Sequence, residues 1–144
     1  MTLQRTDVGV GQTSTGTSRR SPEIFVPLAA RNANPDFWDW PGAFTADSAR
    51  PDKYDRPGVR MRLGTTVVLV NMMTWPIKRD FRLRCEALRS AGNIDDILHL
   101  EKVDPTIGYE YFAEVIPQGT SQYLAHLALC NHPVRNSKKL FGYY

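Results

Sequence analysis

The three histidines of the sequence are the first candidates for chemistry on a phosphodiester. A histidine that attacks phosphorus directly works with a lysine two residues later, whose ammonium group holds the phosphate oxygens. The lysine that follows His99 is Lys102, one residue too far, and on a strand this shift turns the two side chains to opposite faces. Neither His126 nor His132 has a lysine at the required spacing. The sequence therefore lacks the histidine–lysine pair of such a nuclease.

Metal-dependent nucleases use a different arrangement, in which an acidic residue lies two positions before a lysine and another carboxylate lies upstream. Here Asp52 directly precedes Lys53, and Glu101 directly precedes Lys102. Neither pair has the intervening residue that would bring both groups onto one face of a strand. A glycine-rich phosphate loop and a nucleophile elbow are also absent from the sequence.

Cys85 and Cys130 lack the nearby cysteine or histidine residues that a zinc site requires, and we expect both thiols to be reduced in a cytosolic setting. We therefore predict a chain with no catalytic site, metal ion or cofactor of its own. The alternative that stays open is a nuclease whose active site is unrecognised or is completed by dimerisation.

Basic and acidic residues are segregated along the chain. The formal net charge is only +3, but residues 50–89 hold ten basic residues against four acidic ones. Residues 95–114 hold six acidic residues and one lysine, and the chain turns basic again at 135–139. This pattern predicts one positive face, as expected when a phosphate backbone docks on one side of a protein. A merely solvated surface is the other interpretation of the same clusters.

Composition divides the chain into a leader and one domain. Residues 1–21 are rich in Thr, Ser, Gly and Gln, which predicts a flexible leader or linker and suggests that the chain was once joined to something larger. A single folded domain is expected over 22–144. No stretch reaches the roughly 18 to 20 apolar residues that cross a bilayer, so we expect a soluble cytoplasmic protein.

Hydrophobic patterning predicts a mainly β domain with short helices. Arg82 and Arg84 alternate with apolar residues, so a strand here would turn both arginines to one face. Thr120 or Ser121 is expected to cap a helix that runs to about Cys130. The expected strands are 24–28, 59–63, 66–75, 81–85, 97–103 and 109–116, the last two as a hairpin, followed by a short final strand near 140–144.

Two segments are predicted to be exposed loops. Residues 31–58 are interrupted by prolines and glycines and carry five aromatic residues, which is unusual for a disordered loop. Residues 87–96 form a polar, glycine-containing connection. Because functional residues are often carried on loops, these two segments are the expected contact regions.

The order of several short motifs resembles a known family. The motifs are IFVPL at 24–28, DFWDW at 36–40, ILHLEKV at 97–103, YEYFAEVI at 109–116 and VRNSKKLFGY at 134–143. Together they resemble the DNA-recognition domain of phospholipase-D-type, metal-independent restriction endonucleases. The resemblance runs from about residue 23 to the C-terminus.

The resemblance implies a fold and a partner. The fold would be the seven-stranded open pseudobarrel of the plant B3 DNA-binding domain, with short helices. Two arms would grip the major groove of double-stranded DNA, and the loops 31–58 and 87–96 would be those arms. The implied function is sequence-specific recognition by a bacterial type II restriction enzyme, whose nuclease domain would be covalently attached elsewhere in the parent protein. That nuclease domain is absent from this sequence, so cleavage by this chain is not expected.

Both predicted arms contain residue types suited to base edges. Arg suits guanine, Asn suits adenine, and Asp accepts a hydrogen bond from cytosine. The predicted base-reading residues are Arg31, Asn32, Asn34, Asp36, Trp38, Trp40, Arg89, Ser90, Asn93 and Asp95. The alternative is that the Asn and Asp residues only build turns. The predicted phosphate contacts are Arg60, Arg62, Lys78, Arg79, Arg82, Arg84, Lys138 and Lys139.

Overall fold

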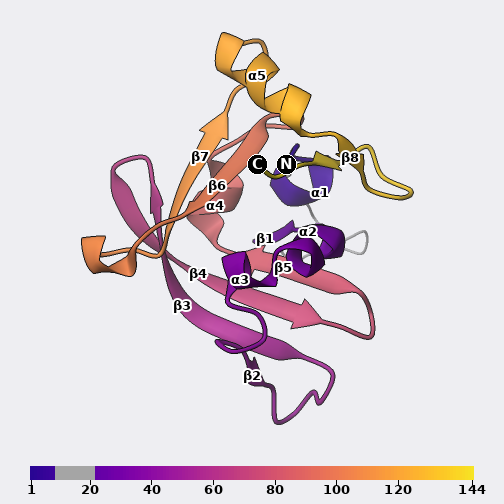
Figure 1. The fold of residues 1–144 in the computed structure, drawn as a ribbon, viewed down its shortest axis with the longest axis vertical. Coiled ribbons are helices and arrows are strands. Elements are labelled where there is room, and N and C mark those ends of the chain that lie inside the picture. The colour runs from indigo at the N-terminus through magenta and orange to yellow at the C-terminus, as the bar shows by residue number, and fades with distance from the viewer. Residues whose placement is uncertain (9–21) are drawn as a thin grey trace, which may run out of the picture.

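Seven strands form one curled, open sheet in the computed structural model, which describes residues 1–8 and 22–144 (Figure 1). The strand order is β1-β5-β4-β3-β7-β6, and β2 pairs with β3 beside this path. All neighbouring strands are antiparallel except β3 and β7, which are parallel. The bounds are β1 (Glu23–Phe25), β2 (Thr45–Ala46), β3 (Tyr54–Leu63), β4 (Thr66–Trp75), β5 (Asp80–Arg84), β6 (Ile97–Lys102) and β7 (Tyr111–Ile116). The prediction of a mainly β fold with an open, curled sheet of seven strands and short helices is confirmed, and this sheet forms a half-barrel.

Short helices and a small second sheet complete the fold. These elements are α1 (Arg5–Val8), α2 (Leu28–Ala33), α3 (Pro35–Trp38), α4 (Glu86–Ser90), the 3-10 helix η1 (Pro105–Ile107), α5 (Ser121–Leu129), β8 (His132–Pro133) and β9 (Leu140–Phe141). The predicted cap of α5 is confirmed, because the Thr120 side chain accepts a 3.0 Å hydrogen bond from the Tyr123 N–H. The predicted 97–116 hairpin is also confirmed, as β6 and β7.

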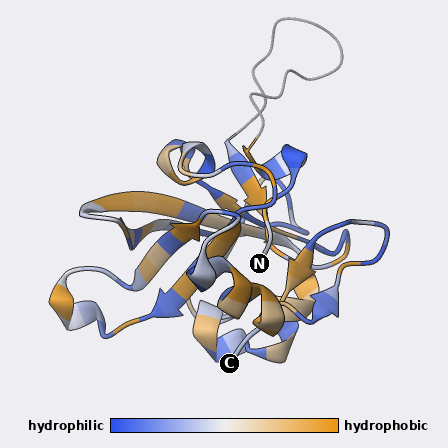
Figure 2. Ribbon diagram, turned by 90° about the horizontal axis from the view of Figure 1, so that it is seen from above, coloured by the Kyte–Doolittle hydropathy of each residue, from blue (hydrophilic) through white to orange (hydrophobic). Residues whose placement is uncertain are grey.

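Alternation along the second half of β3 decides which of its side chains face the core. Val59 and Met61 point into the core, whereas Arg60 and Arg62 are exposed on the outer face. Figure 2 shows hydrophobic and hydrophilic stretches along the strands of the sheet. The half-barrel therefore has an apolar interior and an outer face that carries arginines.

The prediction that Arg82 and Arg84 share a face of β5 is confirmed by their common partner. Both guanidinium groups form ion pairs with the carboxylate of Glu23 on β1, at 2.7 Å for Arg82 and 2.6 Å for Arg84. The sheet register places Glu23 directly opposite Arg84. This cluster joins β1 to β5 on the outer face of the sheet.

Residues 1–8 close part of the opening between the two sheet edges, so the prediction of a flexible leader is wrong for them. Leu3 is fully buried, and the Thr2 N–H donates to the Leu140 carbonyl at 2.9 Å. The Asp7 carboxylate accepts a 2.9 Å hydrogen bond from the Phe25 N–H on β1. Figure 1 shows both termini beside β6. The rest of the predicted leader, residues 9–21, lies outside the described residues.

The two predicted loops contain regular elements as well as turns. Residues 31–58 include the end of α2, all of α3 and β2, and the start of β3, and the strand expected at 24–28 ends at Phe25. Residues 87–96 hold most of α4, in which Leu88 is fully buried, and end at the buried Asp96. Both segments lie against the sheet because their apolar side chains are part of the core.

Among residues 1–8 and 22–144, no helix combines the length and the apolar character needed to span a bilayer.

Candidate functional site

Exposed cations that have no acidic partner are the first feature of the surface that suits a polyanion. They are Arg5, Arg50, Arg60, Arg62, Arg79, Arg135 and Lys138, and none of them pairs with a carboxylate of the described residues. The acidic residues, in contrast, are mostly paired within the fold. The surface therefore carries cations that form no ion pair with a carboxylate of residues 1–8 and 22–144.

The outer face of the β3–β4 hairpin presents two of these cations. Arg62 is oriented by hydrogen bonds from its guanidinium to the Gly64 carbonyl at 3.0 Å and the Tyr109 hydroxyl at 3.3 Å. The register places Arg60 opposite Leu69, whose side chain is 65 % exposed. Arg60 and Arg62 thus stand two residues apart on one face, as two phosphate contacts along a backbone require.

The β4–β5 turn presents a second group of cations. Lys78 has a side chain that is 70 % exposed, and its ammonium lies 3.9 Å from Asp52 in the loop before β3. Arg79 follows with a positive φ of 55° and an exposed side chain. Ile77 beside them is 81 % exposed. A third group, Arg135 and Lys138, lies in the turn between β8 and β9.

Lys139 and Arg82, both predicted phosphate contacts, form ion pairs with acidic residues of the fold. Lys139 is buried and pairs with the Asp7 carboxylate at 2.8 Å, so its assignment to the DNA surface is corrected. Arg82 lies between the rings of Phe25 and Trp75, 4.8 Å and 4.9 Å from their centroids, and also pairs with acidic residues. Its acidic neighbours raise the pKa of Arg82 above its ordinary value.

Two of the predicted base-reading residues are core residues, and their assignment is corrected too. Arg31 is buried, its guanidinium donates to the Thr74 hydroxyl at 2.5 Å, and burial lowers its pKa. It also lies 4.4 Å from the Trp40 ring centroid. Trp38 is buried and contacts the Phe81 ring edge to face, with centroids 4.9 Å apart. An arginine and a tryptophan in a proline-rich segment looked exposed because the sequence does not show the sheet beneath them.

The other predicted residues of the first segment remain at the surface. Asn32, Asn34 and Asp36 are exposed, and Trp40 is partly exposed. Asn34 also has a structural role, because its side-chain oxygen accepts the Phe37 N–H at 3.3 Å and caps α3. The side-chain oxygen of Asn34 therefore has a local structural role, in line with the alternative interpretation of the Asn and Asp residues.

The second predicted segment is organised by Glu86. The Arg89 guanidinium and the Ser90 hydroxyl both donate to its carboxylate, at 2.7 Å and 3.1 Å. Asn93 is exposed, and its N–H donates to the Asp96 carboxylate at 2.8 Å. Asp95 is exposed with a positive φ of 71°. α4 packs against α1 and β1, whereas α2 packs against α3.

Four side chains inside the half-barrel form a cluster that was not predicted from the sequence: Asp39, Arg56, Glu110 and Tyr111. Arg56 is buried on β3 and donates to the Trp38 carbonyl at 3.2 Å and the Tyr111 hydroxyl at 3.1 Å, while it pairs with Asp39 at 3.0 Å and also with Glu110. Burial raises the pKa of Tyr111 to about 12. These contacts anchor α3 against β3 and β7, so Arg56 supports the fold and is not free for a ligand.

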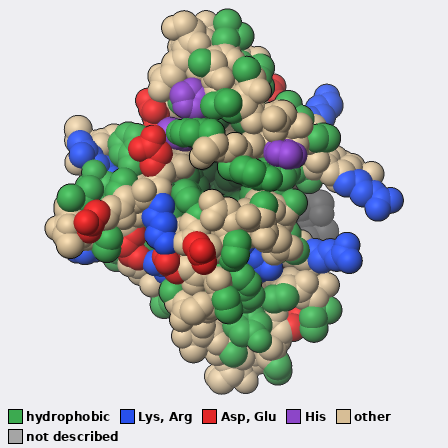
Figure 3. Space-filling view, in the orientation of Figure 1, with side chains coloured by type: hydrophobic (Ala, Val, Ile, Leu, Met, Phe, Trp, Pro, Cys, Tyr) green, Lys and Arg blue, Asp and Glu red, His purple; other side chains and the backbone are tan. Residues whose placement is uncertain are grey.

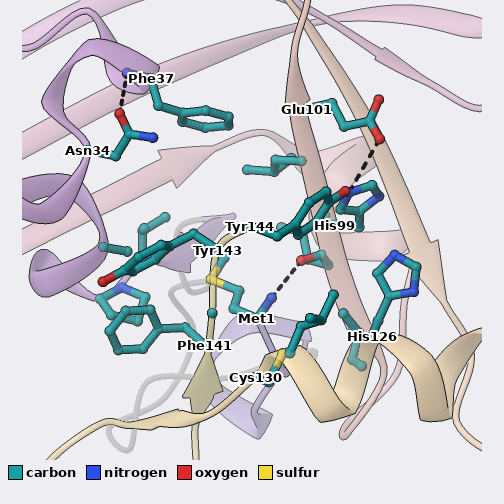
Figure 4. A pocket seen from close by; sticks show the side chains of 18 of the residues that line it. Met1, Asn34, Phe37, His99, Glu101, His126, Cys130, Phe141, Tyr143 and Tyr144 are labelled. Carbon is teal, nitrogen blue, oxygen red and sulfur yellow. Dashed lines mark hydrogen bonds and ion pairs between the residues drawn. The ribbon is translucent and has the colours of Figure 1, made fainter.

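An apolar cavity of about 410 Å³ lies beside β6. Hydrophobic side chains gather around a hollow near the centre of the face drawn in Figure 3. In Figure 4, Asn34 and Phe37 lie on one side of the cavity and His99 and Glu101 on the opposite side, with the C-terminal residues Tyr143 and Tyr144 between them. Its volume falls within the usual range of ligand pockets.

His99 and His126 form the titratable cluster at the rim of this cavity. Their ring centroids are 4.9 Å apart, and His99 Nε2 lies 2.5 Å from the Tyr144 hydroxyl and 3.5 Å from Glu101. The nearest carboxylate oxygen of Glu114 lies 3.9 Å from His99 Nδ1. Burial is the largest effect on His99 and lowers its pKa. The sequence around His99 shows only that a lysine is missing at the required spacing, because nothing local indicates His126 as its neighbour.

The described residues contain no group of histidine, cysteine or acidic side chains arranged to hold a metal ion. Comparison with models of known protein families gives no match, and comparison with curated proteins gives none either. The architecture alone therefore defines the class of this chain: a mainly β domain built on an open, seven-stranded half-barrel.

Proposed function

We propose that this chain binds double-stranded DNA and recognises a short sequence in its major groove, as the recognition domain of a restriction endonuclease with a B3-like fold. The observation that carries the proposal is the set of exposed cations without acidic partners, above all Arg60 and Arg62 on β3. A surface of this kind gains affinity for duplex DNA by releasing the counterions condensed on it.

Ion pairs between acidic side chains and buried cations of the fold support the proposal. Asp7 and Glu110 form ion pairs with the buried cations Lys139 and Arg56 rather than with the exposed Arg60 and Arg62. The side chains suited to base edges that remain exposed are Asn32, Asn34, Asp36, Ser90, Asn93 and Asp95. These offer both donors and acceptors, as base reading requires.

Fluorescence anisotropy of a labelled duplex, measured over a series of salt concentrations, tests the proposal. If six or more phosphates are contacted, raising salt from about 50 to 200 mM lowers affinity roughly a thousandfold. The double variant Arg60→Ala, Arg62→Ala should reduce the salt slope by about 2, because each phosphate contact contributes about 0.9 to it. Thr66→Ala at the end of the same hairpin is the matched control. A salt-independent affinity, or equal slopes for both variants, would overturn the proposal.

A nuclease with an unrecognised active site is the second candidate, and the His99–His126 pair beside the cavity is the observation that favours it. Two histidines can act as general base and general acid in phosphodiester cleavage. Incubation of purified chain with supercoiled plasmid, with and without magnesium, separates the two candidates. Cleavage that persists through purification and disappears in His99→Gln would establish the nuclease, whereas binding without cleavage supports the recognition domain.

A further inference from the structure

The free edge of β6 has an unpaired stretch of backbone. Leu98 exchanges two hydrogen bonds with Met1, one from the Leu98 N–H to the Met1 carbonyl and one from the Met1 amino group to the Leu98 carbonyl, both 2.8 Å long. Alternate residues of a strand direct these groups to the same side, so Leu100 presents its N–H and C=O toward the same edge. Within 1–8 and 22–144, no residue forms a hydrogen bond with these two groups of Leu100.

The unpaired edge adjoins the apolar cavity. Leu98 and Leu100 line it from β6, Ala30 and Phe37 line it from α2 and α3, and Phe141 lines it from β9. Figure 4 shows Phe37 and Phe141 facing the space between the helices and β6. The N–H and C=O groups of Leu100 therefore lie next to a cavity that can hold apolar side chains.

We propose that an extended peptide segment binds here as an added strand, antiparallel to β6 and in line with Met1–Leu3. The continuity with the existing pairing supports this occupant: Thr2 and Ile97 already form an antiparallel bridge on the same edge. Strand addition gains affinity from main-chain hydrogen bonds and specificity from pockets for alternate side chains. Leu100 supplies the hydrogen bonds and the cavity supplies the pocket.

The two faces of β6 determine the chemistry of the peptide. A peptide residue opposite Leu100 projects to the same face as the Leu100 side chain, toward the cavity, and is apolar. A residue opposite Glu101 projects to the face that carries His99 and Glu101 at the rim of the cavity, where the Glu101 side chain is 50 % exposed, and is basic. The segment recognised is therefore an alternation of apolar and basic residues.

The pentapeptide acetyl-Val-Lys-Leu-Lys-Val-amide is the probe, and hydrogen exchange of the Leu100 amide in the full chain is the measurement. Without peptide, this amide should exchange faster than the Leu98 amide, which is bonded to Met1. With saturating peptide, exchange at Leu100 should slow about tenfold or more, while exchange at Leu98 stays unchanged.

Matched probes and variants separate strand addition from nonspecific contact. The same peptide with N-methylleucine at its centre cannot donate to the Leu100 carbonyl, and its Kd should rise about tenfold, equivalent to about 1.4 kcal/mol. Glu101→Gln should weaken binding up to about fivefold, within the range for exposed ion pairs. Ala30→Leu, which narrows the cavity, should weaken it further, and Ala125→Leu on the exposed side of α5 is its control.

Three results would overturn the proposal: equal affinity of the methylated peptide, a Leu100 amide that is already protected in the free protein, or protection of that amide by duplex DNA but not by the peptide. The last result would assign the edge to the DNA surface. Because the peptide experiment contains no nucleic acid, failure of DNA binding leaves its outcome unaffected.

Discussion

The ammonium nitrogen of Lys139 lies 2.8 Å from a carboxylate oxygen of Asp7, and both side chains are buried. Lys139 also donates to the Phe25 carbonyl at 2.5 Å. These contacts tie residues near both ends of the chain to β1. Burial lowers the pKa of Lys139, and the Asp7 carboxylate partly offsets this effect.

Removing the charge of Asp7 should destabilise the fold. Asp7→Asn leaves a buried ammonium group without its counter-charge, which typically costs about 3 to 5 kcal/mol of unfolding free energy. Urea unfolding followed by tryptophan fluorescence measures this loss. Asp36→Asn, at an exposed position, is the control and should change stability by less than about 0.5 kcal/mol. Equal stabilities of the two variants would contradict a structural role for the pair.

Tyr111 should make folding sensitive to alkaline pH. Its folded pKa of about 12 lies above the ordinary value of 10.0, so its contribution to stability is complete below pH 10 and is lost as pH rises toward 12. Tyr111→Phe should flatten the decline in unfolding free energy across this window. The same variant leaves the Phe37 carbonyl, which accepts from the Tyr111 hydroxyl at 2.6 Å, without its donor, at a cost of about 1 to 3 kcal/mol. Tyr109→Phe is the matched control.

His99 should make folding sensitive to mild acid. Burial lowers its pKa below the ordinary 6.5, so the unfolded chain takes up a proton before the folded chain does as pH falls. Stability should therefore decrease on acidification below about pH 6.5 and level off only below the folded pKa. Unfolding free energies of the wild type, His99→Gln and the exposed control His132→Gln, measured from pH 7 downward, test this. A decline of equal slope in all three proteins would contradict the prediction.

Asn93 offers a test of base reading that is independent of phosphate binding. It is exposed, and an asparagine side chain that pairs with adenine contributes about 1 to 3 kcal/mol of discrimination. After a target duplex has been selected from a random pool, Asn93→Ala should weaken binding to that duplex and leave binding to random DNA unchanged. Competition binding with both duplexes measures the ratio. An equal loss on both would assign Asn93 to the DNA backbone or to the fold.

The strands were predictable where local alternation determines them. β4 has the bounds expected from its β-branched run, and β5 turns Arg82 and Arg84 to one face as expected. α5 was predictable because Thr120 is a good cap and the apolar spacing is helical. In each case the deciding signal lies within about ten residues of sequence.

The short helix α3 begins with a local sequence signal, although residues 31–58 were predicted to form a loop. Asn34 followed by Pro35 is a favourable helix start, because the asparagine oxygen accepts from the backbone and proline suits the first helical position. The burial of Trp38 against Phe81 was not predictable, because it depends on a strand far along the sequence. The same holds for Arg31, whose partner Thr74 lies on β4.

The N-terminal segment shows the limit of composition most clearly. Leu3 is surrounded in sequence by polar residues, which predicts flexibility, yet it is fully buried. Its order comes from pairing with the segment before β6, where its carbonyl accepts the Asp95 N–H at 2.9 Å. Such long-range pairing leaves no local pattern to detect.

The hydrogen bond between the Thr2 N–H and the Leu140 carbonyl has a consequence for biosynthesis. The sheet opening is closed by residues that leave the ribosome early together with residues that leave it late. During translation Met1 and Leu3 can pair with the segment that holds Asp95, Asp96 and Leu98 as soon as it emerges, whereas the Thr2–Leu140 hydrogen bond forms only after residue 140 has emerged. Closure of the sheet opening is therefore completed late in the synthesis of this domain.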